Sequence, residues 1–116
     1  YIAQSLIEVN LLKGSSVFKD GDLGDSMYFI FNGKVQISKG GTELVTLNKA
    51  DFFGEMALLD GEARSADAIT IDDAILLKLE ARDFKKILYS NDKIVKGILG
   101  MLSSRLRKAN ELLNKK

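Results

Sequence analysis

Short apolar runs, broken by turn residues, occupy the first two thirds of the chain. The runs are Ser16 to Phe18, Ser26 to Asn32 (SMYFIFN), Lys34 to Lys39 (KVQISK) and Thr42 to Leu47 (TELVTL). Asn32-Gly33 and Gly40-Gly41 separate the last three runs. Asn-Gly between two such runs is a strong hairpin signal, because both residues accept positive φ. Strands this short at this spacing predict a β-sandwich or a β-barrel.

The pattern changes at Gly54, where the segment GEMALL predicts a helix of about one and a half turns. Two further strands are expected at Ala66 to Ile71 and at Ala74 to Leu79. Helical spacing then begins, and Ala81 to Tyr89 places Phe84, Ile87 and Leu88 on one face.

A second C-terminal helix is expected from about Lys93 to Leu113, after a break at Ser90-Asn91-Asp92. Its apolar residues alternate at spacings of four and three, which is an a/d seam. The seam consists of Val95, Leu99, Leu102, Leu106, Ala109 and Leu113. It either pairs two copies of the chain, giving a homodimer, or packs on the barrel of its own chain.

The composition excludes several classes of chemistry. The 116 residues are 46% apolar and 28% charged, which suits one soluble globular domain. No Cys and no His occur, so disulfides, thiolate metal sites and His-dependent catalysis are excluded. No apolar run approaches the roughly 20 residues that span a bilayer. The formal charge of +1 predicts no strong attraction to nucleic acid or acidic membranes.

Residues 53 to 66 combine features of an anion site. Gly54 precedes the short helix, whose first N–H groups and dipole favour a negative ligand. A guanidinium such as Arg64 matches two phosphate oxygens, and Ser65 adds a hydroxyl donor. Glu55 would repel a phosphate unless it accepts hydrogen bonds from sugar hydroxyls. Each residue alone is more simply explained as surface or core, whereas the ordered set is specific.

The segment FGEMALLDGEARSADA, Phe53 to Ala68, resembles the phosphate-binding cassette of the cyclic-nucleotide-binding domain family. The upstream segment FKDGDLGDSMYFIFNGKVQI, Phe18 to Ile37, and LSSRLRKAN, Leu102 to Asn110, are similar to further parts of that family. The resemblance implies a mainly β fold, a barrel or jelly roll (double-stranded β-helix) with a short cassette helix and two C-terminal α-helices. Residues 1–116 would form a single domain, with the barrel at about 8–80 and the helices at about 81–113.

The resemblance also implies roles for individual residues. Arg64 would bind the exocyclic phosphate of cAMP or cGMP, and Glu55 would accept from the ribose 2′-hydroxyl. Ser65 would give a second phosphate contact. The remaining residues expected to line the sugar-phosphate pocket or its walls are Gly54, Met56, Ala57, Leu58, Ala66, Leu44 and Val45.

The sequence departs from the family pattern in three places. Ala63 stands where the family often has Pro, so the loop before Arg64 is expected to be less rigid. Ala50 stands where the family usually has Gly, which predicts an ordinary φ at that turn. Tyr1 to Leu6 offers only a remnant of the usual N-terminal helix, so the chain is expected to be a fragment of a longer protein.

The resulting expectation is a cytoplasmic regulatory module, or one on the cytoplasmic face of a membrane protein, that is not an enzyme. cAMP is favoured, cGMP is possible because Ser65 can contact a guanine, and Ser103, Ser104 and Arg105 are candidates to reach the base. Binding would be transmitted through the C-terminal helices, and the chain itself would bind no metal and no nucleic acid. The alternatives are a ligand-free interaction module with the same fold and, less compatible with the lack of His, a metal enzyme on a similar barrel.

Overall fold

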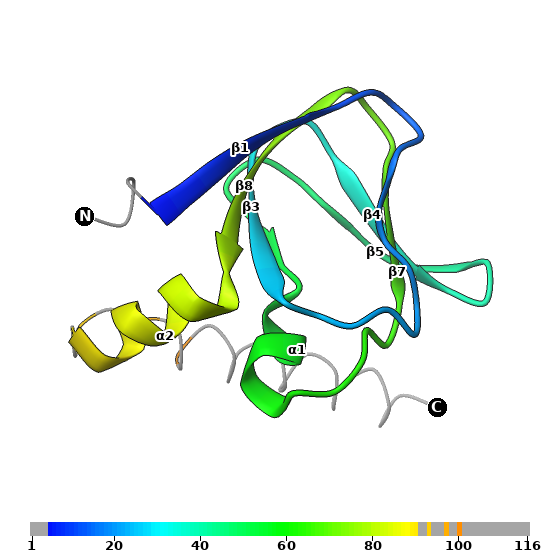
Figure 1. The fold of residues 1–116 in the computed structure, drawn as a ribbon. Helices are drawn as coiled ribbons and strands as arrows, with labels where there is room; N and C mark the ends of the chain where they lie inside the picture. Colours follow the sequence, from blue (N-terminus) through cyan, green and yellow to red (C-terminus); the bar gives the residue numbers. More distant parts are fainter. Residues whose placement is uncertain (1–4, 91–92, 94–96, 98–99, 101–116) are drawn as a thin grey trace. The chain divides into compact units, whose positions relative to one another are not determined.

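The computed structural model describes residues 5–90 together with Lys93, Gly97 and Gly100. The chain divides into two compact units, residues 1–81 and residues 82–116. The elements of the described part are β1 (Leu6–Leu11), β2 (Ser16–Phe18), β3 (Ser26–Asn32), β4 (Val35–Lys39), β5 (Thr42–Leu47), β6 (Phe52–Phe53), α1 (Glu55–Asp60), β7 (Asp67–Thr70), β8 (Ala74–Glu80) and α2 (Ala81–Ser90) (Figure 1).

The strands form two four-stranded antiparallel sheets, ordered β1-β8-β3-β6 and β2-β7-β4-β5. The chain crosses between the sheets repeatedly, which gives the jelly-roll arrangement that the sequence predicts. Within the described residues the two sheets stay separate and do not close into a barrel. The mainly β fold class is therefore confirmed, with an open two-sheet form in place of a closed barrel.

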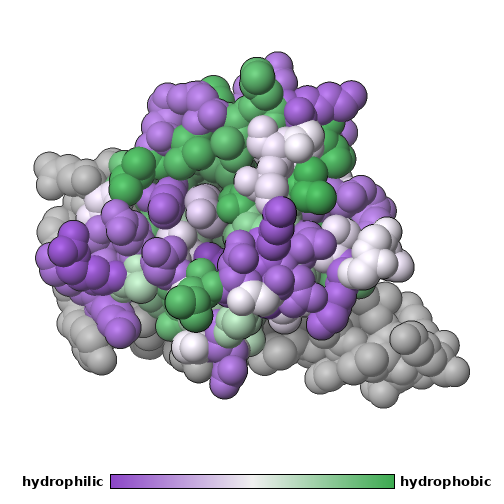
Figure 2. Space-filling view, turned by 45° about the vertical axis from the view of Figure 1, so that its right-hand side comes forward, coloured by the Kyte–Doolittle hydropathy of each residue, from purple (hydrophilic) through white to green (hydrophobic). Residues whose placement is uncertain are grey.

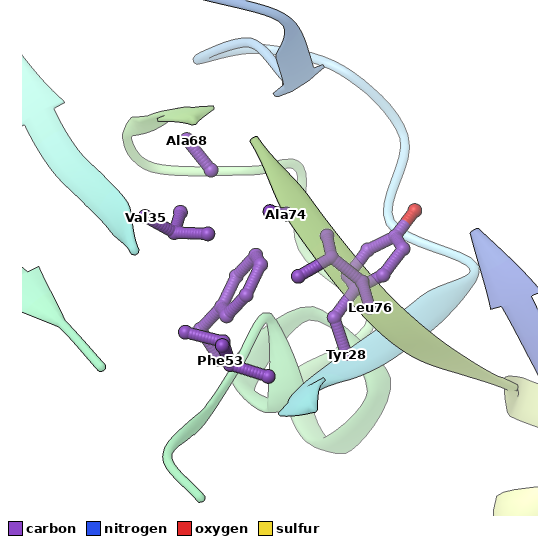
Figure 3. Close-up of a cluster of buried hydrophobic side chains, with 7 residues drawn as sticks. Tyr28, Val35, Phe53, Ala68, Ala74 and Leu76 are labelled. Carbon is purple, nitrogen blue, oxygen red and sulfur yellow. The ribbon is translucent and has the colours of Figure 1, made fainter. Parts of the chain in front are cut away.

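The core of the first unit lies between the two sheets (Figure 3). One sheet contributes the side chains of β3, β6 and β8, and the other contributes Val35 and Ala68, both fully buried. The cluster consists of Tyr28, Ile30, Val35, Phe53, Ala68, Ala74 and Leu76. The rings of Tyr28 and Phe53 stack with centroids 5.3 Å apart. This apolar layer fixes the strands that hold the candidate site described below.

The Asn32-Gly33 turn differs from its predicted role. β3 pairs with β6 and β8, while β4 pairs with β5 and β7, so this turn carries the chain from one sheet to the other and makes no hairpin ladder. Only Gly33 has positive φ, at 95°. A Cβ on Gly33 would lie 2.6 Å from the carbonyl oxygen of Asp73, so close packing against the β7–β8 connection also requires glycine here.

The Gly40-Gly41 turn forms the predicted hairpin. Both glycines have positive φ, and Lys39 pairs with Thr42 across them. The strand β1 was not predicted from the sequence, although Ile7, Val9 and Leu11 alternate with polar residues. It pairs along its whole length with β8.

The predicted ordinary φ at Ala50 is wrong. Ala50 has φ of 76°, in the left-handed region that glycine adopts easily. The turn is held by the backbone of Ile30, whose carbonyl accepts from the Ala50 N–H at 2.9 Å and whose N–H donates to the Asp51 carbonyl at 2.9 Å. Asn48 N–H also donates to the Asp51 carboxylate at 2.8 Å. These contacts impose the conformation in spite of the alanine side chain.

The first C-terminal helix is confirmed as α2, and Phe84 on its expected apolar face is buried. The side chains of Ile87 and Leu88 lie outside the described part. Lys93, Gly97 and Gly100 are helical, whereas the predicted seam (Val95, Leu99, Leu102, Leu106, Ala109 and Leu113) and the candidate base readers Ser103, Ser104 and Arg105 lie outside the described residues. Among the described residues, no helix is both long and apolar enough to cross a membrane.

Candidate functional site

A sharp turn at Gly54 joins β6 to α1. Its φ of 84° lies in the left-handed region, and α1 begins at the next residue, Glu55. A Cβ on Gly54 would lie 2.8 Å from Nη1 of Arg64. The φ of the turn therefore favours glycine here, and the missing Cβ also leaves room for the arginine side chain to approach.

The guanidinium of Arg64 is buried in this turn, and the residue is only 6% exposed. Nη1 donates to the carbonyl of Gly54 at 2.6 Å, and Nη2 donates to the carbonyl of Ser26 at 2.5 Å. Nε has no hydrogen-bond partner among the described residues. A buried N–H without a partner is costly, so this donor is a candidate to bind a ligand acceptor.

The backbone of Arg64 is fixed as firmly as its side chain. Its N–H donates to the carbonyl of Asp22, and its carbonyl accepts from the N–H of Gly21, both at 2.8 Å. The connection from α1 to β7 is thus joined to the loop that follows β2 (Figure 1). The charged side chain starts from a backbone whose N–H and carbonyl are both held by this one distant loop.

Burial lowers the pKa of the Arg64 guanidinium, because desolvation disfavours its charged form. Nearby acidic groups oppose this shift, in the order Tyr28, Asp25, Asp22 and Glu55. Because the ordinary pKa of arginine is so high, the side chain stays protonated at neutral pH. The site thus contains a permanent positive charge in a largely dry environment, where its attraction to an anion is stronger than in bulk water.

Glu55 is the second buried charged residue of the site, at 3% exposed. It occupies the first turn of α1, where a carboxylate complements the helix dipole. Its predicted role as an acceptor for sugar hydroxyls stays a prediction.

The structure brings only part of the predicted set together. Gly54 and Arg64 are in direct contact, and Ala57 is buried on α1. Ser65 is exposed and Ala66 is partly buried, beside Arg64 in the chain. These residues form the centre of the candidate site.

The predicted wall residues lie farther out. Met56 is 47% exposed and Leu58 is partly buried. Leu44 and Val45 lie on the edge strand β5, where Val45 pairs with Ile37, which in turn pairs with Ala68. Val45 is thus two strands from β7, about 10 Å away. Figure 2 shows one face of the molecule, on which apolar side chains are interspersed with hydrophilic ones.

The sequence did not predict the roles of three residues that contribute to the site. Phe18 lies under the guanidinium, with Cζ of Arg64 4.1 Å from its ring centroid. Ser26 supplies a backbone carbonyl. A Cβ on Gly24 would lie 2.2 Å from Cβ of Ala57. The glycine-rich stretch from Phe18 to Ser26 held the signal, but the sequence did not show which residues face Arg64.

No group of three or more potential metal-ligating side chains forms within the described part of the chain. The one charged group with an unpaired buried donor there is Arg64. The arrangement is suited to binding an anion.

Comparison with known proteins places the chain in a family. Residues 8–91 match the model of the cyclic nucleotide-binding domain. The chain is similar to the cyclic AMP receptor protein of Thermus thermophilus, with 35% identity over 103 residues that cover 84% of this chain and 48% of that protein. It thus spans about half the length of this relative.

Solved structures are also similar to this chain over most of its length. The crystal structure of the Thermus thermophilus catabolite activator protein superposes with a TM-score of 0.87 at 30% identity, covering 96% of this chain and 55% of the other. The regulatory domain of Toxoplasma gondii PKA, crystallised with cAMP, gives 0.76 at 26% identity, covering 90% and 41%. With the family model spanning both sheets, the α1 turn and Arg64, the chain belongs to the cyclic nucleotide-binding domain family.

Proposed function

We propose that this chain is a regulatory module that binds cAMP at the turn formed by Gly54, α1 and Arg64. The observation that carries the proposal is the buried Arg64 guanidinium, which keeps one N–H without a partner among the described residues. Burying a charge is costly unless it is compensated. A bound phosphate would compensate it, which favours a ligand-binding role over a ligand-free interaction module.

The proposed contacts follow from the chemistry of each group. Arg64 would bind the exocyclic phosphate oxygens, with Ser65 adding a hydroxyl donor from the exposed side. Glu55 would accept from the ribose 2′-hydroxyl, and the turn at Gly54 and Ala57 would line the sugar-phosphate pocket. Met56, Leu58, Ala66 and Val45 would form its outer walls.

cAMP is the favoured nucleotide because the relatives described above are named for cAMP or were crystallised with it. cGMP remains the second candidate, since the Ser65 hydroxyl can serve a guanine as well as a phosphate. The chain would act by binding and not by catalysis, in the cytoplasm or on the cytoplasmic face of a membrane protein. Binding would be passed on through the C-terminal helices, because a ligand shifts an equilibrium by preferring one of its states.

Thermal unfolding with cAMP, cGMP and AMP tests the proposal. A ligand at about a hundred times its dissociation constant should add about 2.7 kcal/mol to the free energy of unfolding. AMP is the matched control, because it has the same base and sugar but lacks the cyclic phosphodiester. We expect the largest rise in Tm with cAMP. The absence of any shift with either cyclic nucleotide at millimolar concentration would refute the proposed function.

A further inference from the structure

The face of the Phe18 ring lies directly under the charged group of the site. We propose that Phe18 is a positioning residue, which orients the Arg64 guanidinium toward the ligand phosphate through a cation–π contact. The inference rests on the proposed function, because it assigns to Phe18 a part in ligand affinity. Phe18 itself would not touch the ligand.

The contact between Phe18 and Arg64 is built into the backbone. Phe18 ends β2 and pairs with Ala68 of β7, four residues after Arg64. The loop after β2 then binds both backbone groups of Arg64, through Gly21 and Asp22. The ring and the guanidinium are therefore brought together by strand pairing on one side of the contact and by loop hydrogen bonds on the other, with 4.1 Å between Cζ and the ring centroid.

The ring of Phe18 is itself held by other aromatic side chains. Its centroid lies 5.9 Å from that of Phe53 and 6.3 Å from that of Tyr28, both at tilted angles. Tyr28 and Phe53 belong to the buried core. The position of the ring face is thus tied to the core between the sheets.

The cation–π contact does something that the two hydrogen bonds cannot do. The carbonyl oxygens of Gly54 and Ser26 accept from Nη1 and Nη2, so these bonds restrain tilting of the guanidinium plane about the line through the two nitrogens less than any other motion. A ring face below the plane removes that freedom, and the negative π cloud stabilises the positive charge without occupying a donor. Nε therefore stays available in a fixed direction.

This arrangement predicts a gain in ligand affinity from pre-organisation. A guanidinium that is already oriented loses less freedom when the phosphate arrives. Leucine at position 18 would keep an apolar side chain but lose the π face. A desolvated cation–π contact is strong enough for its loss to weaken cAMP binding about tenfold.

The test is a double-mutant cycle on the whole chain, with cAMP as the probe in isothermal titration. Phe18→Leu should raise the dissociation constant about tenfold, whereas Phe18→Tyr, which keeps the ring, should stay within threefold of the unchanged protein. In an Arg64→Ala background, Phe18→Leu should change the dissociation constant less than twofold, because its route to the ligand has been removed. Phe29→Leu is the matched control: it removes a ring that packs on Phe52 and should leave affinity unchanged.

The same four proteins of the cycle are also unfolded thermally without ligand. The Tm losses of Phe18→Leu and Arg64→Ala should be non-additive if the ring holds the guanidinium. Additive Tm losses, or an equal loss of affinity from Phe18→Leu in both backgrounds, would show an ordinary packing role and overturn the inference. If the unchanged chain binds no cyclic nucleotide while the Tm losses are non-additive, the proposed function fails but the ring–guanidinium contact stands.

Discussion

At the scale of single residues, Ala50 adopts a backbone conformation that its Cβ disfavours. Its φ of 76° is imposed by hydrogen bonds to Ile30. Ala50→Gly should remove about 1–2 kcal/mol of backbone strain, because glycine adopts the left-handed region easily. Part of this gain is lost, because glycine also gives the unfolded chain more conformational freedom. We expect a net rise of about 0.5–1 kcal/mol in the free energy of unfolding, measured in urea.

Ala63→Gly is the matched control for Ala50. Ala63 is exposed and does not have a positive φ. Glycine therefore relieves no backbone strain at this position. The control should leave stability unchanged or lower it. Equal stabilisation by both substitutions would contradict the role assigned to the Ala50 backbone.

Arg64 has both a structural role and a proposed binding role. Arg64→Ala removes the donors that serve the carbonyls of Gly54 and Ser26, which should cost about 1–3 kcal/mol of stability. Loss of a charged donor to the phosphate should also raise the dissociation constant for cAMP more than tenfold. Urea unfolding and titration measure the two effects separately.

The control for Arg64 is Arg82→Ala, an exposed arginine on α2. It changes the net charge by the same amount but removes no described hydrogen bond of the site. Its affinity and stability should both stay close to those of the unchanged protein. If Arg64→Ala left affinity as it was, phosphate binding would have to be assigned elsewhere.

At the scale of elements, the loop before β3 and helix α1 approach more closely than a side chain on Gly24 would allow. A Cβ there would lie 2.2 Å from Cβ of Ala57 and 3.1 Å from Cζ of Arg64. Gly24→Ala should therefore displace α1, lower stability by about 1–3 kcal/mol and weaken cAMP binding.

The double variant Gly24→Ala with Ala57→Gly tests whether this clash is the cause. Removing the methyl group of Ala57 gives the new Cβ room, although glycine in a helix costs about 1 kcal/mol by itself. Affinity for cAMP should recover at least in part, as measured by titration. If the double variant loses as much binding free energy for cAMP as the two single variants together, a steric conflict between the loop and α1 is ruled out.

The sequence predicted the bounds of the strands more successfully than the pairing between them. The extents of β2, β3 and β5 and the Gly40-Gly41 turn followed from local apolar runs and turn residues. The pairing of β3 with β8 depends on residues far apart in the chain, so a local Asn-Gly signal could not show that β4 would join the other sheet. The φ of Ala50 likewise comes from long-range bonds to Ile30, which override the preference of alanine.

The candidate site shows the same difference between local features, which the sequence predicted, and long-range contacts, which it did not. The turn at Gly54 and the short helix are local, and the sequence placed them correctly. The contacts of Arg64 with Phe18 and Ser26 join three separate segments, and no spacing rule connects residues 18, 26 and 64. Whether Val45 reaches the ligand stays a prediction, as do the contacts of Glu55 and Ser65.

At the scale of the whole molecule, a homodimer through the predicted seam on the last helix is one of the two alternatives that the sequence leaves open. Its residues lie outside the described part, so the test is made in solution. If the seam pairs two copies, light scattering with and without cAMP should show a dimer that Leu106→Glu dissociates, because a charge in the seam is not tolerated. The neighbouring Arg107→Glu, off the seam, should leave the dimer intact. A monomer at high concentration in both states would exclude the homodimer.

The pairing of β1 with β8 has a consequence for the nascent chain during translation. Among the described strands, the first, β1, pairs only with the last, β8, with Leu6 opposite Leu79. At about 5–20 residues per second, a ribosome needs several seconds to add the intervening segment. During that time β1 emerges without a neighbour, and its polar positions Glu8 and Asn10 make it a poorer template for strands of other chains. Slowing translation before residue 74 would prolong this exposure and lower the soluble yield of the protein.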